Sequence, residues 1–311
     1  MSLETDLLLD RRRLKSRLIL WRSLTVILLV VALLIGFGRM AGTLTSSSRH
    51  IARLDIQGTI GTDSALEKKI RDLAENDSAL GLIVRINSPG GSVAGGEGLH
   101  DAIAKVAAKK PVVAVMGSTA ASAGYMVALP AARIFARGST LTGSIGVLLE
   151  TGEASVLMDR VGIRAEAITS GPLKDQPSLT KPLSPEGRLV LRGLVDDIFD
   201  QFVTMVATER KMDKTRVLQF ADGRAYTGRQ ALELGLIDQI GDEGAAREWL
   251  DRDRQLPITL PVRDLNEERW TRRVLQSSLG GIWDRLAKTL FGQSLMLDGA
   301  MAVWQPSSTG G

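Results

Sequence analysis

The chain has 311 residues, enough for one large domain or two smaller ones, and it contains no cysteine. That absence excludes disulfides, cysteine nucleophiles and cysteine-bound metals. The only two histidines, His50 and His100, are too few for a histidine-rich metal site, so we expect no metal or other cofactor. The net charge is +4, and residues 1–22 hold six lysines and arginines against three carboxylates. The basic excess therefore belongs to the N-terminus and indicates no nucleic-acid partner.

A long apolar segment follows a basic tail at residues 1–17. Residues 18–38 contain one charge, Arg22, and their 21 residues are long enough to cross a hydrocarbon core of ~30 Å. Because the cations precede this segment, it predicts a single-pass anchor in the cytoplasmic (inner) membrane, with the N-terminus in the cytoplasm and the rest outside. The alternative is a signal peptide cleaved after the Gly-Phe-Gly at 36–38, but such peptides have shorter apolar runs.

The middle of the chain alternates between two kinds of apolar pattern. After a Ser/Thr/Gly-rich linker at 39–50, short apolar runs alternate with segments of helical spacing as far as residue 255. We expect strands at 51–60, 80–86, 112–115, 133–136 and 165–169, and helices at 63–75, 95–109, around 122–129, 153–161 and 184–211. This alternation predicts one α/β domain at 51–255, with a parallel sheet and flanking helices.

Residues 256–311 form a tail with a weaker pattern. A charged stretch is followed by apolar residues at helical spacing: Leu275, Leu279, Ile282, Leu286 and Leu290. An amphipathic helix of this kind packs on its own domain or on a neighbour, and the alternative is that it lies on a membrane surface.

The segment 112–129 has the residue types that a serine nucleophile requires. Its β-branched start gives way to Gly117-Ser118-Thr119 and then to small residues around Ser122, which we place near the first turn of a helix. Small neighbours let a substrate backbone approach, and a helix N-terminus favours the negative charge that develops on an attacked carbonyl. A small-residue helix packed on a sheet, with Ser122 as a spacer, has the same pattern.

A glycine loop follows the strand expected at 80–86. The backbone N–H groups of Gly90 and Gly91 have no side chains to obstruct them, as an oxyanion hole requires. An ordinary Pro-Gly turn would have the same sequence. Because the carboxyl ends of parallel strands meet at one edge of a sheet, this loop, Ser122 and a third loop that carries Lys174 are expected to converge there.

A serine nucleophile also needs a base, and the loop at 170–185 offers Lys174. Lysine can accept a proton when a dry setting lowers its pKa, and the leucine and prolines of this loop can supply that setting. Asp175 argues against this unless its carboxylate points away, because a nearby negative charge keeps a lysine protonated. His100 is the rival base. His50 is placed in the linker, which is a poor position for a base.

These residues stand in motifs that resemble the signal peptide peptidase A family of serine–lysine proteases, in its short, single-domain form. The resemblance covers about residues 50–250 and rests on R-I-N-S-P-G-G (85–91), M-G-S-T-A-A-S-A-G-Y (116–125), T-L-T-G-S-I-G-V (140–147), S-G-P-L-K-D (170–175) and D-G-R-A-Y-T-G-R-Q-A-L-E-L-G-L-I-D (222–238). One departure is Ala123, where the family usually has glycine. A helix tolerates alanine better than glycine, so we expect activity to be retained although the extra methyl narrows the site.

The resemblance implies a ClpP/crotonase-like fold and a set of site residues. In that family pattern Ser122 is the nucleophile, Lys174 the general base, Ser144 the hydroxyl that orients the lysine, and Gly90-Gly91 the oxyanion hole. It also implies a homo-oligomer in which neighbouring subunits share catalytic residues. The 52 residues between the serine and the lysine permit a dyad within one chain or across two.

The predicted function is a membrane-anchored serine endopeptidase that degrades cleaved signal peptides and similar hydrophobic peptides, with 51–255 as its catalytic domain. An acyl-CoA enzyme on the same crotonase-like fold is the nearest alternative, and detectable coenzyme A binding would favour it. A catalytically inactive membrane scaffold is another alternative. Its role in the cell would survive Ser122→Ala, whereas the role of a serine protease would not.

Overall fold

A computed structural model describes residues 21–22, 25–26, 29 and 49–265. The chain divides into two compact units, residues 1–263 and 264–311, and nearly all described residues belong to the first. Within the described residues, no helix is long and apolar enough to cross a membrane. Most of the predicted anchor at 18–38, and the whole helix predicted at 275–290, lie outside the described residues.

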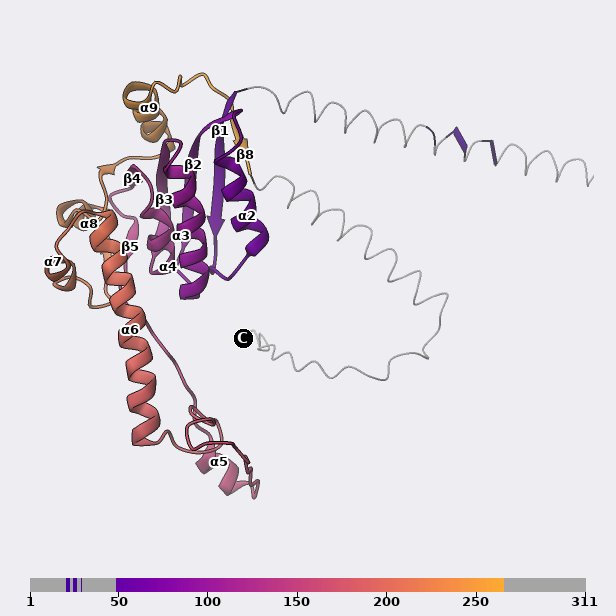
Figure 1. The fold of residues 1–311 in the computed structure, drawn as a ribbon, viewed down its shortest axis with the longest axis vertical. Coiled ribbons are helices and arrows are strands. Elements are labelled where there is room, and N and C mark those ends of the chain that lie inside the picture. The colour runs from indigo at the N-terminus through magenta and orange to yellow at the C-terminus, as the bar shows by residue number, and fades with distance from the viewer. Residues whose placement is uncertain (1–20, 23–24, 27–28, 30–48, 266–311) are drawn as a thin grey trace, which may run out of the picture. The chain divides into compact units, whose positions relative to one another are not determined.

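One sheet organises the described part of the chain (Figure 1). Its strand order is β6-β5-β3-β2-β1-β8, and β4 pairs with both β3 and β7. The pairs β1–β2, β2–β3, β3–β4, β3–β5 and β4–β7 are parallel, and β5–β6 is antiparallel. The strands are β1 (His50–Gln57), β2 (Ala79–Ser88), β3 (Val112–Ala121), β4 (Arg133–Ala136), β5 (Leu141–Gly143), β6 (Ala225–Thr227), β7 (Gln239–Ile240) and β8 (Val262–Asp264). The predicted α/β fold with a parallel sheet is therefore confirmed.

Helices connect these strands. They are α2 (Ser64–Leu73), α3 (Val93–Ala107), α4 (Ala123–Ala128), α5 (Ser155–Arg160), α6 (Pro185–Glu209), α7 (Lys214–Leu218), α8 (Gly228–Leu234) and α9 (Glu243–Arg254). Side-chain caps define where several of them begin. The Asp63 carboxylate accepts from the N–H of Leu66 at α2, and the Ser92 hydroxyl accepts from the N–H of Gly95 at α3.

Strand β3 is longer than its apolar run indicates. The sequence predicts a strand that ends at residue 115, whereas β3 continues to Ala121 because its two halves have different partners. The first half pairs with β4 at Val113–Val115, and the second pairs with β5 at Thr119–Ala121. Sequence reasoning treated β5 as part of a loop. The extension moves Ser122 from the first turn of a helix to the junction between β3 and α4.

The strand predicted at 165–169 is wrong. These residues are exposed and belong to no strand, and Ile168 is 96% exposed. They lie in the segment between α5 and α6, which Figure 1 shows at the end of α6 away from the sheet. A segment forms a strand only where a neighbouring strand can satisfy its backbone, and no strand of the described residues pairs with this one.

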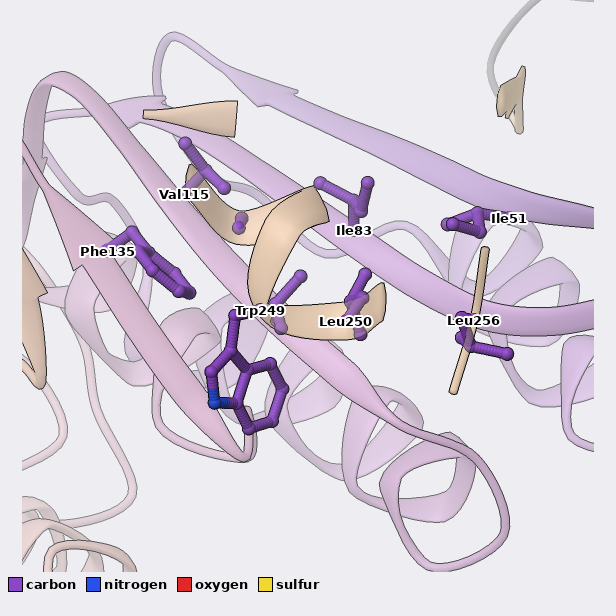
Figure 2. Close-up of a cluster of buried hydrophobic side chains, with 9 residues drawn as sticks. Ile51, Ile83, Val115, Phe135, Trp249, Leu250 and Leu256 are labelled. Atoms are coloured by element: carbon purple, nitrogen blue, oxygen red, sulfur yellow. The ribbon is translucent and has the colours of Figure 1, made fainter. Parts of the chain in front are cut away.

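Helix α9 covers one face of the sheet and builds the core there (Figure 2). Trp249 and Leu250 of α9 pack on Ile83 and Val113, which are fully buried on neighbouring strands. The Trp249 ring also contacts two arginines, with its centroid 5.7 Å from the Arg133 guanidinium carbon and 5.2 Å from that of Arg254.

Helix α6 is buried only in part. Of the apolar face predicted along this helix, Phe202 and Val206 are buried, but Leu189 is 74% and Leu194 54% exposed. The helix thus packs on the domain through its C-terminal half. Its N-terminal half extends away from the sheet and carries the segment that contains α5 (Figure 1).

A partly buried ion pair holds the C-terminal end of α6. The Arg210 guanidinium donates to both carboxylate oxygens of Asp238, at 3.1 and 2.6 Å, and to the carbonyl of Gly235 at 2.9 Å. Asp238 also accepts from the N–H of Ile134 in β4. Although burial alone would lower it, the hydrogen bonds with Asp238 raise the pKa of Arg210. This pair therefore ties the end of α6 to β4.

Candidate active site

Ser122 stands at the point where β3 turns into α4, in a backbone conformation that serine rarely adopts. Its φ is +54° and its ψ −123°, and its N–H donates to the Gly143 carbonyl at 2.9 Å. Such strain persists only where the surrounding structure enforces it, and it is commonest at functional sites. Within the described part of the chain, the Ser122 hydroxyl makes no hydrogen bond and faces a cavity.

The glycine loop that follows β2 lies directly against Ser122. Gly90 has φ +112°, and a Cβ at this position would lie 2.8 Å from the Cβ of Ser122, so only glycine fits. Its N–H donates to the buried hydroxyl of Ser88 at 3.1 Å. The N–H of Gly91 donates to no group among residues 49–265. Of the two amides predicted to form an oxyanion hole, only that of Gly91 is free to bind a substrate oxygen.

Ser144 directly follows Gly143, whose carbonyl accepts the N–H of Ser122. It also has a left-handed backbone, with φ +49°. Its hydroxyl donates to the Gly223 carbonyl at 3.1 Å, and its N–H donates to the Arg224 carbonyl at 3.0 Å. The segment 143–144 therefore connects the nucleophile to a turn at 222–224.

These groups border one cavity of about 670 Å³. Ser122, Ser144 and Gly91 lie on its wall, together with Asp222 and Gly223. Helix α6 adds a charged pair, in which Arg192 donates to Asp196. The rest of the lining is mainly apolar: Pro89, Val93, Val147, Leu148, Val195, Phe199 and Ala221. The cavity thus offers a serine hydroxyl and a free amide beside an apolar surface.

Lys174 does not lie in this cavity. It is exposed, in the loop between α5 and α6, where its N–H donates to the carbonyl of Gly171. Two residues further on, the Gln176 side chain accepts from the N–H of Ser184 at the beginning of α6. The lining residues of α6, 192–199, are more than a helical turn away from that end. Ser122 and Lys174 are therefore not brought together within one chain.

The Asp175 carboxylate, which would keep a nearby lysine protonated, is paired with a lysine other than Lys174. Asp175 forms an ion pair with Lys181 at 2.8 Å, and the hydrogen bond from Lys181 lowers the pKa of Asp175. Its charge is thus directed toward another lysine of the same loop.

Neither histidine lines the cavity. His50 was placed in the linker by sequence reasoning, but it is the first residue of β1 and is buried, because the strand begins one residue earlier than predicted. His100 is buried on α3. Its Nδ1 lies 3.0 Å from Asp101 and its Nε2 lies 3.3 Å from Glu209, the last residue of α6. Both of its ring nitrogens therefore face carboxylates outside the cavity.

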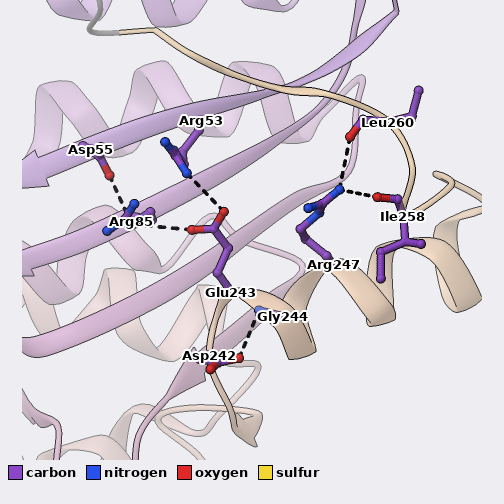
Figure 3. A network of polar contacts seen from close by, with 9 residues as sticks. All are labelled: Arg53, Asp55, Arg85, Asp242, Glu243, Gly244, Arg247, Ile258 and Leu260. Atoms are coloured by element: carbon purple, nitrogen blue, oxygen red, sulfur yellow. Dashed lines mark hydrogen bonds and ion pairs between the residues drawn. The ribbon is translucent and has the colours of Figure 1, made fainter.

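A second cavity, of about 570 Å³, lies at the N-terminal end of α9. Figure 3 shows the ion pairs at its side. Glu243 contacts Arg53 at 3.4 Å and Arg85 at 3.6 Å, and Arg85 also contacts Asp55 at 3.3 Å. These pairs connect β1 and β2 to α9, so their evident role is structural. Among the described residues, no group of three or more histidines and carboxylates is arranged to hold a metal ion.

Sequence reasoning missed three contributors to the first cavity: the Gly143 carbonyl, the Ser88 hydroxyl and the turn at 222–224. The motifs that contain them were noticed, but their roles depend on contacts between residues far apart in the chain. Ser144 and Gly223, for example, are 79 residues apart.

Comparison with known proteins finds proteases among the relatives of this chain. The profile of peptidase family S49 matches residues 104–257, and the profile of Clp protease matches residues 48–146. The chain is 41% identical over 207 residues to a putative protease of Synechocystis, covering 66% of this chain and 74% of that protein. It is 32% identical over 238 residues to a putative signal peptide peptidase SppA of Enterococcus faecium, covering 71% and 69%. Protease 4 of Salmonella typhi is 37% identical over 186 residues, covering 60% of this chain and 30% of that protein.

Proposed function

Because the chain belongs to peptidase family S49, the signal peptide peptidase A family of serine proteases, we propose that it is a membrane-anchored endopeptidase with a Ser122/Lys174 dyad. Its proposed substrates are cleaved signal peptides and similar hydrophobic peptides. The observation that carries this proposal is the strained Ser122 at the β3–α4 junction, with its hydroxyl on the cavity wall and the free amide of Gly91 beside it.

In the proposed mechanism, the Ser122 hydroxyl attacks the peptide carbonyl while Lys174 takes its proton. The negative oxygen of the tetrahedral intermediate accepts hydrogen bonds from the N–H groups of Gly91 and Ala123. Ala123 is suited to this because the first N–H of a helix has no partner within the helix. Lys174 then gives the proton to the leaving amine, and water hydrolyses the acyl-enzyme.

The lysine is supplied by a neighbouring subunit in this proposal. Lys174 is exposed in the loop before α6 and does not line the cavity of its own chain. The segment that carries it also exposes an unusual number of large apolar side chains: Leu148, Val156, Leu157, Val161, Ile163, Ile168, Leu179, Leu189 and Leu194. A surface of this kind marks an interface with another protein. Contact between copies of the chain would cover these residues and bring Lys174 to a partner's Ser122.

The substrate proposal rests on the apolar lining of the cavity and on the predicted anchor. Apolar side chains such as Val93, Val195 and Phe199 favour hydrophobic residues in a bound peptide. An anchor at 18–38 would hold the site near a membrane, where signal peptides remain after their release.

Labelling with a serine-reactive phosphonate, followed by mass spectrometry, tests the proposal on the wild type, Ser122→Ala and Lys174→Ala. We expect one adduct on Ser122 in the wild type and none in either variant. An adduct that persists without Lys174 would contradict the lysine base. No adduct in the intact wild-type oligomer would favour a catalytically inactive scaffold.

A further inference from the structure

The hydroxyl of Ser144 has a fixed direction in this structure. A serine hydroxyl carries one proton and two lone pairs, so it can donate only one hydrogen bond at a time. Ser144 gives its proton to the Gly223 carbonyl, at 3.1 Å. Toward the cavity, the same oxygen can therefore only accept a hydrogen bond.

The carbonyl that takes this proton belongs to a tightly held turn, Asp222-Gly223-Arg224. The N–H of Gly223 donates to the Ile145 carbonyl, and the Arg224 carbonyl accepts from the N–H of Ser144, both at 3.0 Å. The turn and the Ser144 segment thus exchange three hydrogen bonds, which leave the Gly223 carbonyl little freedom to rotate.

Two side chains keep the turn in shape. The Asp222 carboxylate accepts from the backbone N–H of Arg224 at 3.1 Å and from its Nε at 2.9 and 2.7 Å. After the turn, the Tyr226 hydroxyl donates to the Phe220 carbonyl at 2.9 Å, which ties its two flanks together. Gly223 itself has φ +87° with open space around its Cα, so the position requires glycine for its backbone angle and not for room.

We propose that the Asp222-Gly223-Arg224 turn is a positioning device for the proton transfer: through Gly223, it makes Ser144 an obligate hydrogen-bond acceptor toward the lysine amine. This inference rests on the proposed dyad. An amine that donates one N–H to Ser144 turns its lone pair away from that oxygen and toward the Ser122 hydroxyl. The Ser122 proton moves to the lysine nitrogen as the Ser122 oxygen bonds to the substrate carbonyl, and Ser144 keeps its own proton throughout.

Without the Gly223 carbonyl, the Ser144 proton could turn toward the lysine and occupy the lone pair that must accept the Ser122 proton. The other charged groups at this cavity are partly neutralised in pairs. Arg192 donates to Asp196 at 2.9 and 3.0 Å on α6, and Arg224 donates to Asp222 in the turn. The direction of the Ser144 hydroxyl therefore depends mainly on Gly223.

A double-mutant cycle with Ser144→Ala and Gly223→Ala tests this in the full-length protein. A misplaced catalytic group costs about 100-fold in rate, so we expect each single variant to lower kcat by about tenfold to 100-fold with little change in KM. The acid limb of the pH–rate profile should shift to lower pH in both, because the charged amine loses its acceptor. In the double variant, kcat should match that of Ser144→Ala, since the turn acts only through Ser144.

Gly58→Ala is the matched control, because Gly58 has a similar φ of +71° with open space and lies neither in the cavity lining nor in the proposed interface. Circular dichroism and the oligomer size establish that each variant is folded.

If Gly223→Ala fails to fold, Asp222→Asn loosens the turn more mildly and should give a smaller loss of kcat in the same direction. Additive losses in the double variant, or an unshifted pH profile, would overturn the inference. The dyad itself would be refuted only if Ser122→Ala or Lys174→Ala retained activity, so the two failures are distinguishable.

Discussion

At the scale of single residues, the site depends on backbone positions that tolerate few alternatives. Ser122 and Ser144 are both held at positive φ, and hydrogen bonds to Gly143 and Gly223 fix them. Each such residue costs of the order of 1–3 kcal/mol. These strained backbone conformations place the two serines on the wall of one cavity.

Lys174→Ala is expected to abolish peptide hydrolysis while the free energy of unfolding stays near that of the wild type. The side chain is exposed, so its removal leaves no cavity, whereas loss of a general base costs about 10²–10⁴-fold in rate. Hydrolysis of a fluorogenic hydrophobic peptide and denaturant unfolding measure the two effects. Lys68→Ala, an exposed lysine on α2, is the control and should be unchanged. Undiminished hydrolysis by Lys174→Ala would contradict the dyad.

Ser88→Ala should impair both stability and activity. Ser88 is fully buried, and its hydroxyl accepts the N–H of Gly90. Its loss leaves that N–H unsatisfied, which costs about 1–3 kcal/mol, and releases the loop that carries the free amide of Gly91. We expect kcat to fall about tenfold or more, since loss of an oxyanion donor costs about 10²–10³-fold. Ser118→Ala removes an exposed hydroxyl outside this cavity and should leave kcat near its wild-type value.

At the scale of elements, the short helix α4 holds Ser122 in place through its buried side. Tyr125 of α4 is fully buried, and its hydroxyl donates to the Leu236 carbonyl at 2.8 Å. Burial raises the pKa of Tyr125 well above its usual value. The folded state therefore holds this proton more tightly than the unfolded state does.

This difference predicts a specific alkaline behaviour. The contribution of a neutral Tyr125 to stability is fully present below the tyrosine pKa of the unfolded chain, about 10, and is lost as the pH rises above it. Tyr125→Phe should lose about 1 kcal/mol at neutral pH with the hydrogen bond, and should lack this alkaline decline. Denaturant unfolding from about pH 7 to 11 compares the two proteins. A difference that stays constant over the whole range would contradict the prediction.

At the scale of the whole molecule, the chain exposes apolar surface where its proposed base lies. Leu189 and Leu194 of α6 are more than half exposed, and Ile168 is almost completely so. In a ring or dome of identical subunits, one surface of each copy meets a different surface of the next, which brings different residues of two copies to each interface.

Mixed oligomers test whether the dyad forms across subunits. Ser122→Ala and Lys174→Ala should each be inactive alone. When they are unfolded together in equal amounts and reassembled, about a quarter of the sites should combine an intact serine with a neighbour's intact lysine. Hydrolysis should therefore recover to about a quarter of the wild-type rate. No recovery in oligomers that contain both variants, verified by mass spectrometry, would indicate a dyad within one chain.

The sequence alone determined the local parts of this protein. The strand β4 and the helices α2, α3 and α6 lie within about two residues of their predicted bounds, because apolar spacing and capping residues are local signals. The small residues around Ser122 and the paired glycines marked the candidate site for the same reason. The roles of Ser122 and Lys174 themselves remain predictions until the experiments above are done.

Only the tertiary structure decided the features that depend on distant partners. β3 continues to Ala121 because β5 pairs with it, and the segment at 165–169 is no strand because no described strand pairs with it. Likewise, the direction of the Ser144 hydroxyl depends on a carbonyl 79 residues away, and the separation of Lys174 from Ser122 follows from the way α6 leaves the domain. Backbone hydrogen bonds and burial must be satisfied by whatever lies nearby in space, and local sequence does not specify that neighbour.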